Sequence, residues 1–265
     1  MVGVVDVNRR RLAVFPFLNG APLPARRSWP PEYFNASRSA DTNGARVGVP
    51  DKSIWNGYAH SAQLTNRPNQ MILSPDFVEA LTQAGHLHRK QTRKGTEIPY
   101  LSHIMAVATI VLEHGGSEEE AIAALLHDAV EDQGGQPVLD WIRRRFGTTV
   151  ADIVEGCTDA YAEPKPEWQK RKVAYIAHLR DPKTSASTRL VSAADKLHNA
   201  SAILYDYRRL GDDLWKRFTG GRECTLWYYA AVVEALRTGG DTDLLRELDE
   251  VVTRLRAAAN ANGAT

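Results

Sequence analysis

The chain has 265 residues with 43% hydrophobic and 25% charged side chains, which is the composition of an ordinary globular domain. Its formal net charge of +1 provides no field to attract nucleic acid or an anionic membrane, so we expect neither as a partner. Two cysteines exclude a disulfide framework and no apolar run reaches the roughly 20 residues that span a bilayer, which favours a cytoplasmic protein.

The first 70 residues differ from the rest of the chain. They hold most of the prolines and show neither a helical nor an alternating pattern of apolar residues. Such a segment buries too little apolar surface to offset the entropy lost on ordering. We therefore expect residues 1–70 to form an irregular or flexible extension, and residues 71–260 to form the folded domain.

From Ser74 onward the pattern predicts helices almost throughout. Ser74 and Pro75 are a typical helix start, and Ser117 with Glu120 forms a capping box. Glycine pairs at 115–116 and 134–135 are expected to end two of the helices. No alternating stretch predicts a strand, so we expect a single all-α domain. The expected helices are 75–90, 99–114, 118–133, 137–146, 149–160, 168–180, 187–210, 215–218, 223–237 and 242–259.

The chemically unusual stretch is 121–132, an apolar helix that ends in His127-Asp128 and then Glu131-Asp132. Four ionisable side chains within six positions are costly to place beside a core unless an ion compensates them. On a helix, His127 and Asp128 point about 100° apart, so both can flank one ion. An imidazole and a carboxylate without a nearby cysteine favour a mixed nitrogen and oxygen site for a divalent metal.

Two other apolar helices each carry one further candidate ligand. His103 lies at the start of the helix expected at 99–114, and Asp195 interrupts the apolar centre of the helix at 187–210. Each alone has an ordinary explanation, since a lone histidine near a helix start is usually capped and Asp195 could pair with Lys196. Together with His127 and Asp128 they form an ordered set on three helices, which is far more specific.

This H…HD…D order resembles the signature of the HD-domain metal-dependent phosphohydrolases. The flanking residues are similar to the hydrolase half of Rel/Spo-type alarmone enzymes, and most of all to the stand-alone small alarmone hydrolases. The resemblance runs from about Phe77 to Leu204. The stretches that carry it are Arg93-Lys94, Pro99-Tyr100, 124–132, Phe146-Gly147 and 194–199.

The resemblance implies a helical HD-domain bundle that removes the 3′-pyrophosphate from guanosine tetra- and pentaphosphate with the help of Mn²⁺. It further implies that Glu131 and Asp132 position and deprotonate the attacking water or protonate the leaving group. Arg93, Lys94 and Asn199 would contact the nucleotide. The implied metal ligands are His103, His127, Asp128 and Asp195.

Three departures from the family pattern leave the substrate open. The basic loop reads Arg93-Lys94-Gly95-Thr96-Glu97-Ile98-Pro99-Tyr100, one residue longer than usual; Gln133 stands where threonine is common; and 156–159 reads Gly-Cys-Thr-Asp instead of Gly-Val-Thr-Lys. The same pyrophosphohydrolase reaction on adenosine alarmones is therefore an open alternative. Another is an HD-family phosphatase or phosphodiesterase that acts on a different nucleotide, such as NADPH or a dNTP. A non-catalytic nucleotide-binding HD domain is a further alternative, and a homo-oligomer is compatible with the sequence.

A second basic cluster, Lys170-Arg171-Lys172, is interpreted as a solvated helix face.

Overall fold

The computed structural model describes residues 71–161 and 165–262, so the expected N-terminal extension lies outside the described residues. The described part is helical and contains no strand, only an isolated bridge between Thr92 and Pro99. The all-α prediction is therefore confirmed. None of its helices is both long and apolar enough to cross a membrane. The helices are α2 (Pro75–Leu87), α3 (Leu101–Glu113), α4 (Glu118–Leu126), α5 (Ala129–Gln133), α6 (Gln136–Phe146), α7 (Thr148–Cys157), α8 (Trp168–Arg180), α9 (Ala186–Leu210), η2 (Gly211–Arg217), α10 (Gly221–Leu236), η3 (Arg237–Gly239) and α11 (Asp243–Asn262).

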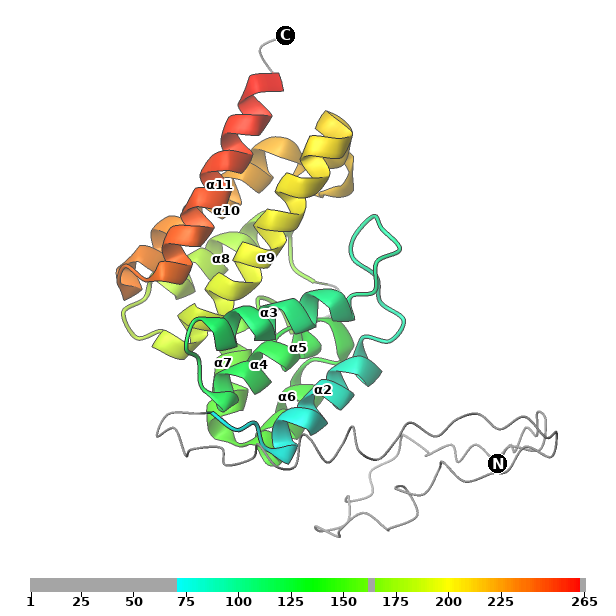
Figure 1. The fold of residues 1–265 in the computed structure, drawn as a ribbon, viewed down its shortest axis with the longest axis vertical. Helices are drawn as coiled ribbons and strands as arrows, with labels where there is room; N and C mark the ends of the chain where they lie inside the picture. The colour runs from blue at the N-terminus through cyan, green and yellow to red at the C-terminus, as the bar shows by residue number, and fades with distance from the viewer. Residues whose placement is uncertain (1–70, 162–164, 263–265) are drawn as a thin grey trace, which may run out of the picture. The chain divides into compact units, whose positions relative to one another are not determined.

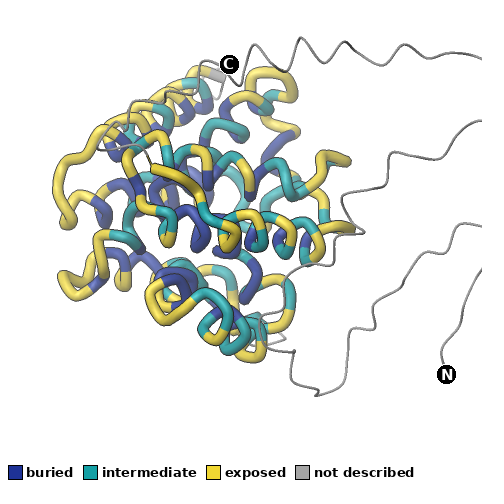
Figure 2. The backbone as a smooth tube through the Cα atoms, turned by 60° about the horizontal axis from the view of Figure 1, so that its bottom comes forward, coloured by how far each residue is buried: buried dark blue, intermediate teal, exposed yellow. Residues whose placement is uncertain are grey.

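The long helix α9 joins the two groups of helices visible in Figure 1. It packs against α3, α4 and α7 and also against α10 and α11. The helix α4 lies between α3 and α7, and each of the six residues at 121–126 is buried. Figure 2 shows buried segments gathered in the interior, with exposed segments around them. The centre of α9 and the end of α4 are thus held inside the bundle.

Several helix boundaries follow from the capping residues in the sequence. The Ser74 side chain accepts a hydrogen bond from the Asp76 backbone, and Pro75 occupies the first turn of α2. Ser117 and Glu120 form the reciprocal capping box predicted for α4. Gly134 follows α5 with a backbone φ of 153°, which residues other than glycine rarely adopt. The predicted capping signals at these positions are confirmed.

The main local difference from the sequence prediction is a break in the central helix. We expected one helix over 118–133, but α4 ends at Leu126 and α5 begins at Ala129. Asp128 has φ −95° and ψ −3°, which lie outside the regular helical values. The side chain of His127 also donates from Nδ1 to the Ala124 carbonyl, at 2.8 Å. This bond satisfies a carbonyl near the end of α4, where helical carbonyls lack a backbone partner.

Other helix ends differ by only a few residues. The helix α2 ends at Leu87 rather than near residue 90, and α7 ends at Cys157 rather than near residue 160. The short helix expected at 215–218 is the 3₁₀ helix η2 at Gly211–Arg217. Between α2 and α3, the basic loop folds back on itself because the Arg93 backbone N–H donates to the Ile98 carbonyl, at 2.8 Å.

Candidate active site

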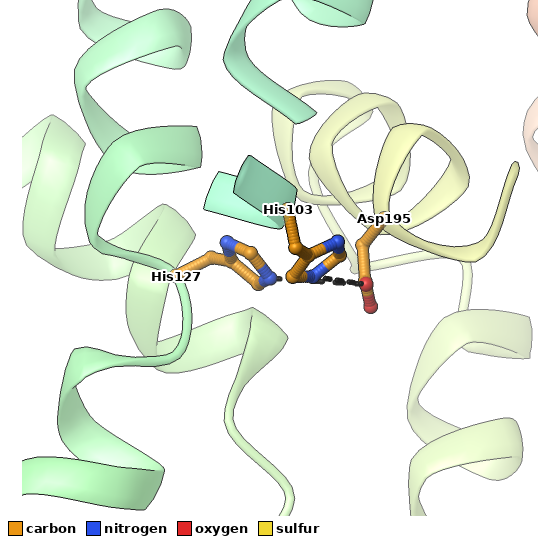
Figure 3. Close-up of side chains that lie close together, drawn as sticks. All are labelled: His103, His127 and Asp195. Carbon is orange, nitrogen blue, oxygen red and sulfur yellow. Dashed lines mark ion pairs between the residues drawn. The ribbon is translucent and has the colours of Figure 1, made fainter. Parts of the chain in front are cut away.

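Three helices and one helix break bring the four predicted metal ligands together. His103 lies in the first turn of α3, His127 directly follows α4, Asp128 precedes α5, and Asp195 lies within α9. His103, His127 and Asp195 are buried, with 0%, 2% and 6% of their surface exposed. The side chain of Asp128 is 19% exposed. Figure 3 shows the two imidazoles and the Asp195 carboxylate converging from separate segments.

The distances suit ligands of a single ion. His127 Nε2 lies 3.0 Å from Asp128 Oδ2, and His103 Nε2 lies 3.2 Å from Asp195 Oδ1. The crossed distances are 3.7 Å from His103 Nε2 to Asp128 Oδ2 and 3.8 Å from His127 Nε2 to Asp195 Oδ1. Ligand atoms that each lie about 2.1 Å from one ion are separated by roughly 3 to 3.5 Å. These distances agree with the expectation that His127 and Asp128 flank one ion together with His103 and Asp195.

The hydrogen bonds of the two histidines also fit a metal ion. Neither Nε2 has a hydrogen-bond partner among the described residues, although both are buried. The Nδ1 atom of His127 donates to the Ala124 carbonyl, which leaves the Nε2 lone pair available. The Nδ1 of His103 lies 2.8 Å from Nδ1 of His198, which can accept its proton. Both imidazoles can therefore present Nε2 to a cation.

The charges of the cluster also leave a place for a cation. Burial lowers the pKa of His127, but Asp128 and Asp195 outweigh it and hold this pKa well above its usual range. Burial raises the pKa of Asp128, yet His127 and His103 bring it well below its usual range. Two buried carboxylates thus require positive charge in their midst, which a proton or a divalent cation supplies. The donor set of two imidazoles and two carboxylates fits a divalent ion.

Neighbouring side chains fix the two carboxylates. The Tyr100 hydroxyl donates to Asp128 Oδ2, at 2.5 Å. On α9, Asn199 Nδ2 donates to Asp195 Oδ1 at 2.5 Å, and Lys196 forms a close ion pair with Asp195 Oδ2. Such outer contacts orient metal ligands and hold them in place. The sequence singled out Asn199 for another role, and it gave no role to Tyr100.

Glu131 and Asp132 lie side by side at the edge of the cluster. Lys165 Nζ contacts both, at 2.9 Å from Glu131 Oε1 and 3.1 Å from Asp132 Oδ1. Gln91 donates to the other Asp132 oxygen, at 2.8 Å. These residues face a cavity of about 390 Å³, which is lined by Leu87, Lys90, Gln91, Glu131, Asp132, Gln133 and Lys165. A polar cavity thus adjoins the predicted acid pair.

The environment of Glu131 favours a group that exchanges protons. Burial and then the nearby Asp159 charge raise the pKa of Glu131 above its usual range, while Lys165 opposes them. A raised carboxyl pKa brings protonation closer to neutral pH, where a general acid or base is most effective.

The predicted nucleotide contacts divide into two groups. Arg93 points back toward α9, where its Nη2 donates to Asn199 Oδ1 at 3.0 Å and its Nη1 lies 3.5 Å from His198 Nδ1. The structure therefore brings Arg93 and Asn199 together beside Asp195, one of the predicted metal ligands. Lys94 instead directs its Nζ toward Thr219 Oγ1, at 3.5 Å.

The interpretation of the 170–172 cluster as a solvated face was wrong for two of its three residues. Lys170 is exposed, but the side chains of Arg171 and Lys172 are only 12% and 18% exposed. Both pair with Asp159, and Arg171 also reaches Glu131. The acidic residue at 159, which departs from the family pattern described above, was the available signal that basic partners lie nearby.

Comparison with known proteins identifies the family to which the described domain is similar. A model of the HD domain family matches residues 80–223. The Xenopus tropicalis protein named guanosine-3′,5′-bis(diphosphate) 3′-pyrophosphohydrolase MESH1 is 36% identical over 142 residues, covering 52% of this chain and 73% of that protein. The GTP pyrophosphokinase of Streptomyces coelicolor is 30% identical over 202 residues, which cover 69% of this chain but 23% of that much longer protein.

A solved structure gives the same result for the fold. The protein described as a metazoan orthologue of SpoT that hydrolyses ppGpp superposes with a TM-score of 0.58 at 31% identity. The match covers 70% of this chain and 98% of that protein. The similarity therefore extends over nearly the whole of the smaller protein.

Proposed function

The chain belongs to the HD domain family, and from this premise we propose that it is a metal-dependent hydrolase that removes the 3′-pyrophosphate from guanosine tetra- and pentaphosphate or their adenosine analogues. The observation that carries the proposal is the buried cluster of two histidines and two aspartates with a separate acid pair beside it. The activity named for two smaller relatives and for a protein of similar fold supports the same chemistry.

We assign the metal to His103, His127, Asp128 and Asp195, and we propose Mn²⁺ as the resident ion. Two carboxylates together with two imidazoles suit manganese, which accepts oxygen ligands more readily than softer metals do. When bound, such an ion polarises a phosphoryl oxygen and makes a water molecule more acidic.

The protein groups around the ion divide the remaining tasks. Glu131 is the group that takes a proton from the attacking water or delivers one to the leaving oxygen, since its pKa is raised. Asp132 is held by Gln91 and Lys165, so it can orient the water. Lys165 lies against both carboxylates and offers positive charge to a phosphate that enters the cavity.

We propose that Arg93 and Asn199 read the nucleoside. The guanidinium of Arg93 is planar and is held by a hydrogen bond to Asn199, so it can stack on a base or donate a hydrogen bond to it. Lys94 is assigned to the phosphates that extend toward Thr219. The metal and acid residues act on any pyrophosphate ester, and the loop at 93–97 selects the nucleotide.

Replacing Arg93 with alanine is expected to raise KM about 10- to 100-fold while kcat changes little, because the contact is made equally in the ground state and the transition state. Steady-state kinetics with guanosine tetraphosphate measures this. Arg89→Ala removes an exposed arginine at the start of the same loop and serves as the matched control. An unchanged KM in Arg93→Ala would remove this residue from the substrate site.

The proposed activity is tested by the identity of the released product. The protein is incubated with Mn²⁺ and, in separate reactions, with guanosine and adenosine tetra- and pentaphosphates, NADPH and dNTPs. Chromatography with ³¹P NMR then distinguishes pyrophosphate from orthophosphate. We expect pyrophosphate from a tetra- or pentaphosphate. Orthophosphate alone would establish a phosphatase of the same family, and no release from any substrate would favour the non-catalytic alternative.

A further inference from the structure

Asp159 lies just beyond the end of α7 and is one of the least accessible acids of the domain. Its side chain is only 3% exposed, and it pairs with two residues of α8. Lys172 Nζ lies 2.6 Å from Oδ2, and Arg171 Nη1 forms a close ion pair with Oδ1. Burial alone would raise the pKa of Asp159, but Lys172 and Arg171 bring it below its usual range. The carboxylate is therefore ionised and fixed between α7 and α8.

Arg171 connects this buried pair to the acid pair of the active site. The same Nη1 atom that contacts Asp159 lies 3.4 Å from Glu131 Oε1. Lys165 approaches the same Oε1 atom, at 2.9 Å. Arg171 has a side chain only 12% exposed, so water screens these contacts weakly. One guanidinium nitrogen is thus shared between a structural carboxylate and the proposed proton carrier.

Lys172 strengthens the anchoring of Asp159. Its Nζ lies 5.1 Å from the centre of the Tyr228 ring, which is buried on α10. A cation over an aromatic face is attracted to it, so Lys172 is held on two sides. Asp159 and its two cations therefore form a rigid connection between the end of α7, the start of α8 and α10.

We propose that Asp159 is a positioning residue that acts through Arg171 to set the place and the protonation of Glu131. The proposal rests on the proposed function of Glu131 in proton transfer. Without Asp159, Arg171 would turn fully toward Glu131 and hold it as a tight, permanently ionised pair. With Asp159, the guanidinium is restrained and Glu131 keeps a contact weak enough for its proton to move.

All charged groups that face Glu131 enter this balance. Lys165 precedes α8 and Arg171 lies on it, while Asp159 follows α7. The segment that carries Glu131 itself contributes the carboxylates of Asp128 and Asp132. The Asp159 charge raises the pKa of Glu131, second only to burial, and Lys165 lowers it. Removing Asp159 should therefore lower the pKa of Glu131, and removing Arg171 should raise it.

The test compares Asp159→Asn, Arg171→Met and the double variant with Asp152→Asn. Asp152 lies on α7, is exposed and pairs with Arg143 outside the site, so it is the matched control. With Mn²⁺ and guanosine tetraphosphate, we expect kcat to fall about tenfold in each single variant, as for other residues that orient an active group. KM should change less than twofold, and the double variant should be no worse than the single ones.

The titration of Glu131 distinguishes positioning from general damage to the fold. The ¹³C chemical shift of its side-chain carboxyl, followed against pH in the Mg²⁺-loaded protein, gives its pKa without turnover. We expect the pKa of Glu131 to fall in Asp159→Asn and to rise in Arg171→Met. The corresponding limb of the profile of kcat against pH should move in the same direction. Asp159→Glu, which keeps the charge, should recover part of both effects.

Several results would overturn the proposal. They are an unchanged Glu131 titration in Asp159→Asn, a shift in the same direction in both single variants, or losses of kcat that multiply in the double variant. A loss of kcat matched by the loss of folded protein in circular dichroism would also overturn it. Failure of the proposed function is seen separately, because wild-type protein would then release no pyrophosphate while the titration still reports on Asp159.

Discussion

Asp128→Ala is expected to reduce pyrophosphate release at least about 10³-fold and to abolish tight binding of Mn²⁺. Asp128 supplies one of the two carboxylates of the cluster and lies 3.0 Å from His127 Nε2. Its loss also deprives the Tyr100 hydroxyl of its acceptor. A metal ion contributes several kcal/mol to the stabilisation of a phosphoryl transition state, and about 4 kcal/mol corresponds to about 10³ in rate.

The measurement is the rate of release together with the metal content, determined by plasma mass spectrometry after dialysis against Mn²⁺. Asp140→Ala is the control, because Asp140 is partly buried on α6 and accepts a hydrogen bond from Gln136 away from the site. The control should keep both activity and metal. Retention of stoichiometric Mn²⁺ in Asp128→Ala would remove Asp128 from the ligand set.

Glu131→Gln is expected to lower kcat by about 10² to 10⁴ while metal content and KM stay close to wild type. Glutamine has the same shape but cannot take up or release the proton. The raised pKa of Glu131 further predicts that, in the profile of wild-type kcat against pH, one limb has an apparent pKa above the usual range of a glutamate. This limb should disappear in the variant, because the titrating group is gone.

The control for this variant is Glu155→Gln. Glu155 is an exposed glutamate on α7, and its Oε2 lies 3.0 Å from Nη2 of Arg143. Its pH profile should match that of wild type. If Glu131→Gln kept full kcat with an unchanged pH profile, another group would carry the proton. If it lost the metal instead, Glu131 would belong to the ligand set.

The fold and the convergence of the four proposed ligands could be predicted because each has a local signal. Helix starts at Ser74 and Ser117 follow from side chains that satisfy free backbone N–H groups. His103 and Asp195 were detectable because a polar residue within an apolar helix face needs a partner in the core. The order of these residues with His127 and Asp128 then pointed to one centre.

The remaining parts of the site depend on packing that local patterns do not specify. The break between α4 and α5 results from the geometry at Asp128 and from the side-chain bond of His127, whereas the apolar pattern continues through both. Lys165 reaches Glu131 and Asp132 from a loop more than thirty positions away in sequence. Arg171 and Lys172 looked solvated because their buried partner, Asp159, lies on another helix end.

The central claim is that His103, His127, Asp128 and Asp195 hold one divalent ion, and anomalous X-ray diffraction tests it most directly. Crystals grown with Mn²⁺ would be measured above and below the manganese absorption edge. We expect one strong peak about 2.1 Å from Nε2 of both histidines and in contact with an oxygen of both aspartates. A map without a peak there, or with the manganese bound elsewhere, would contradict the account.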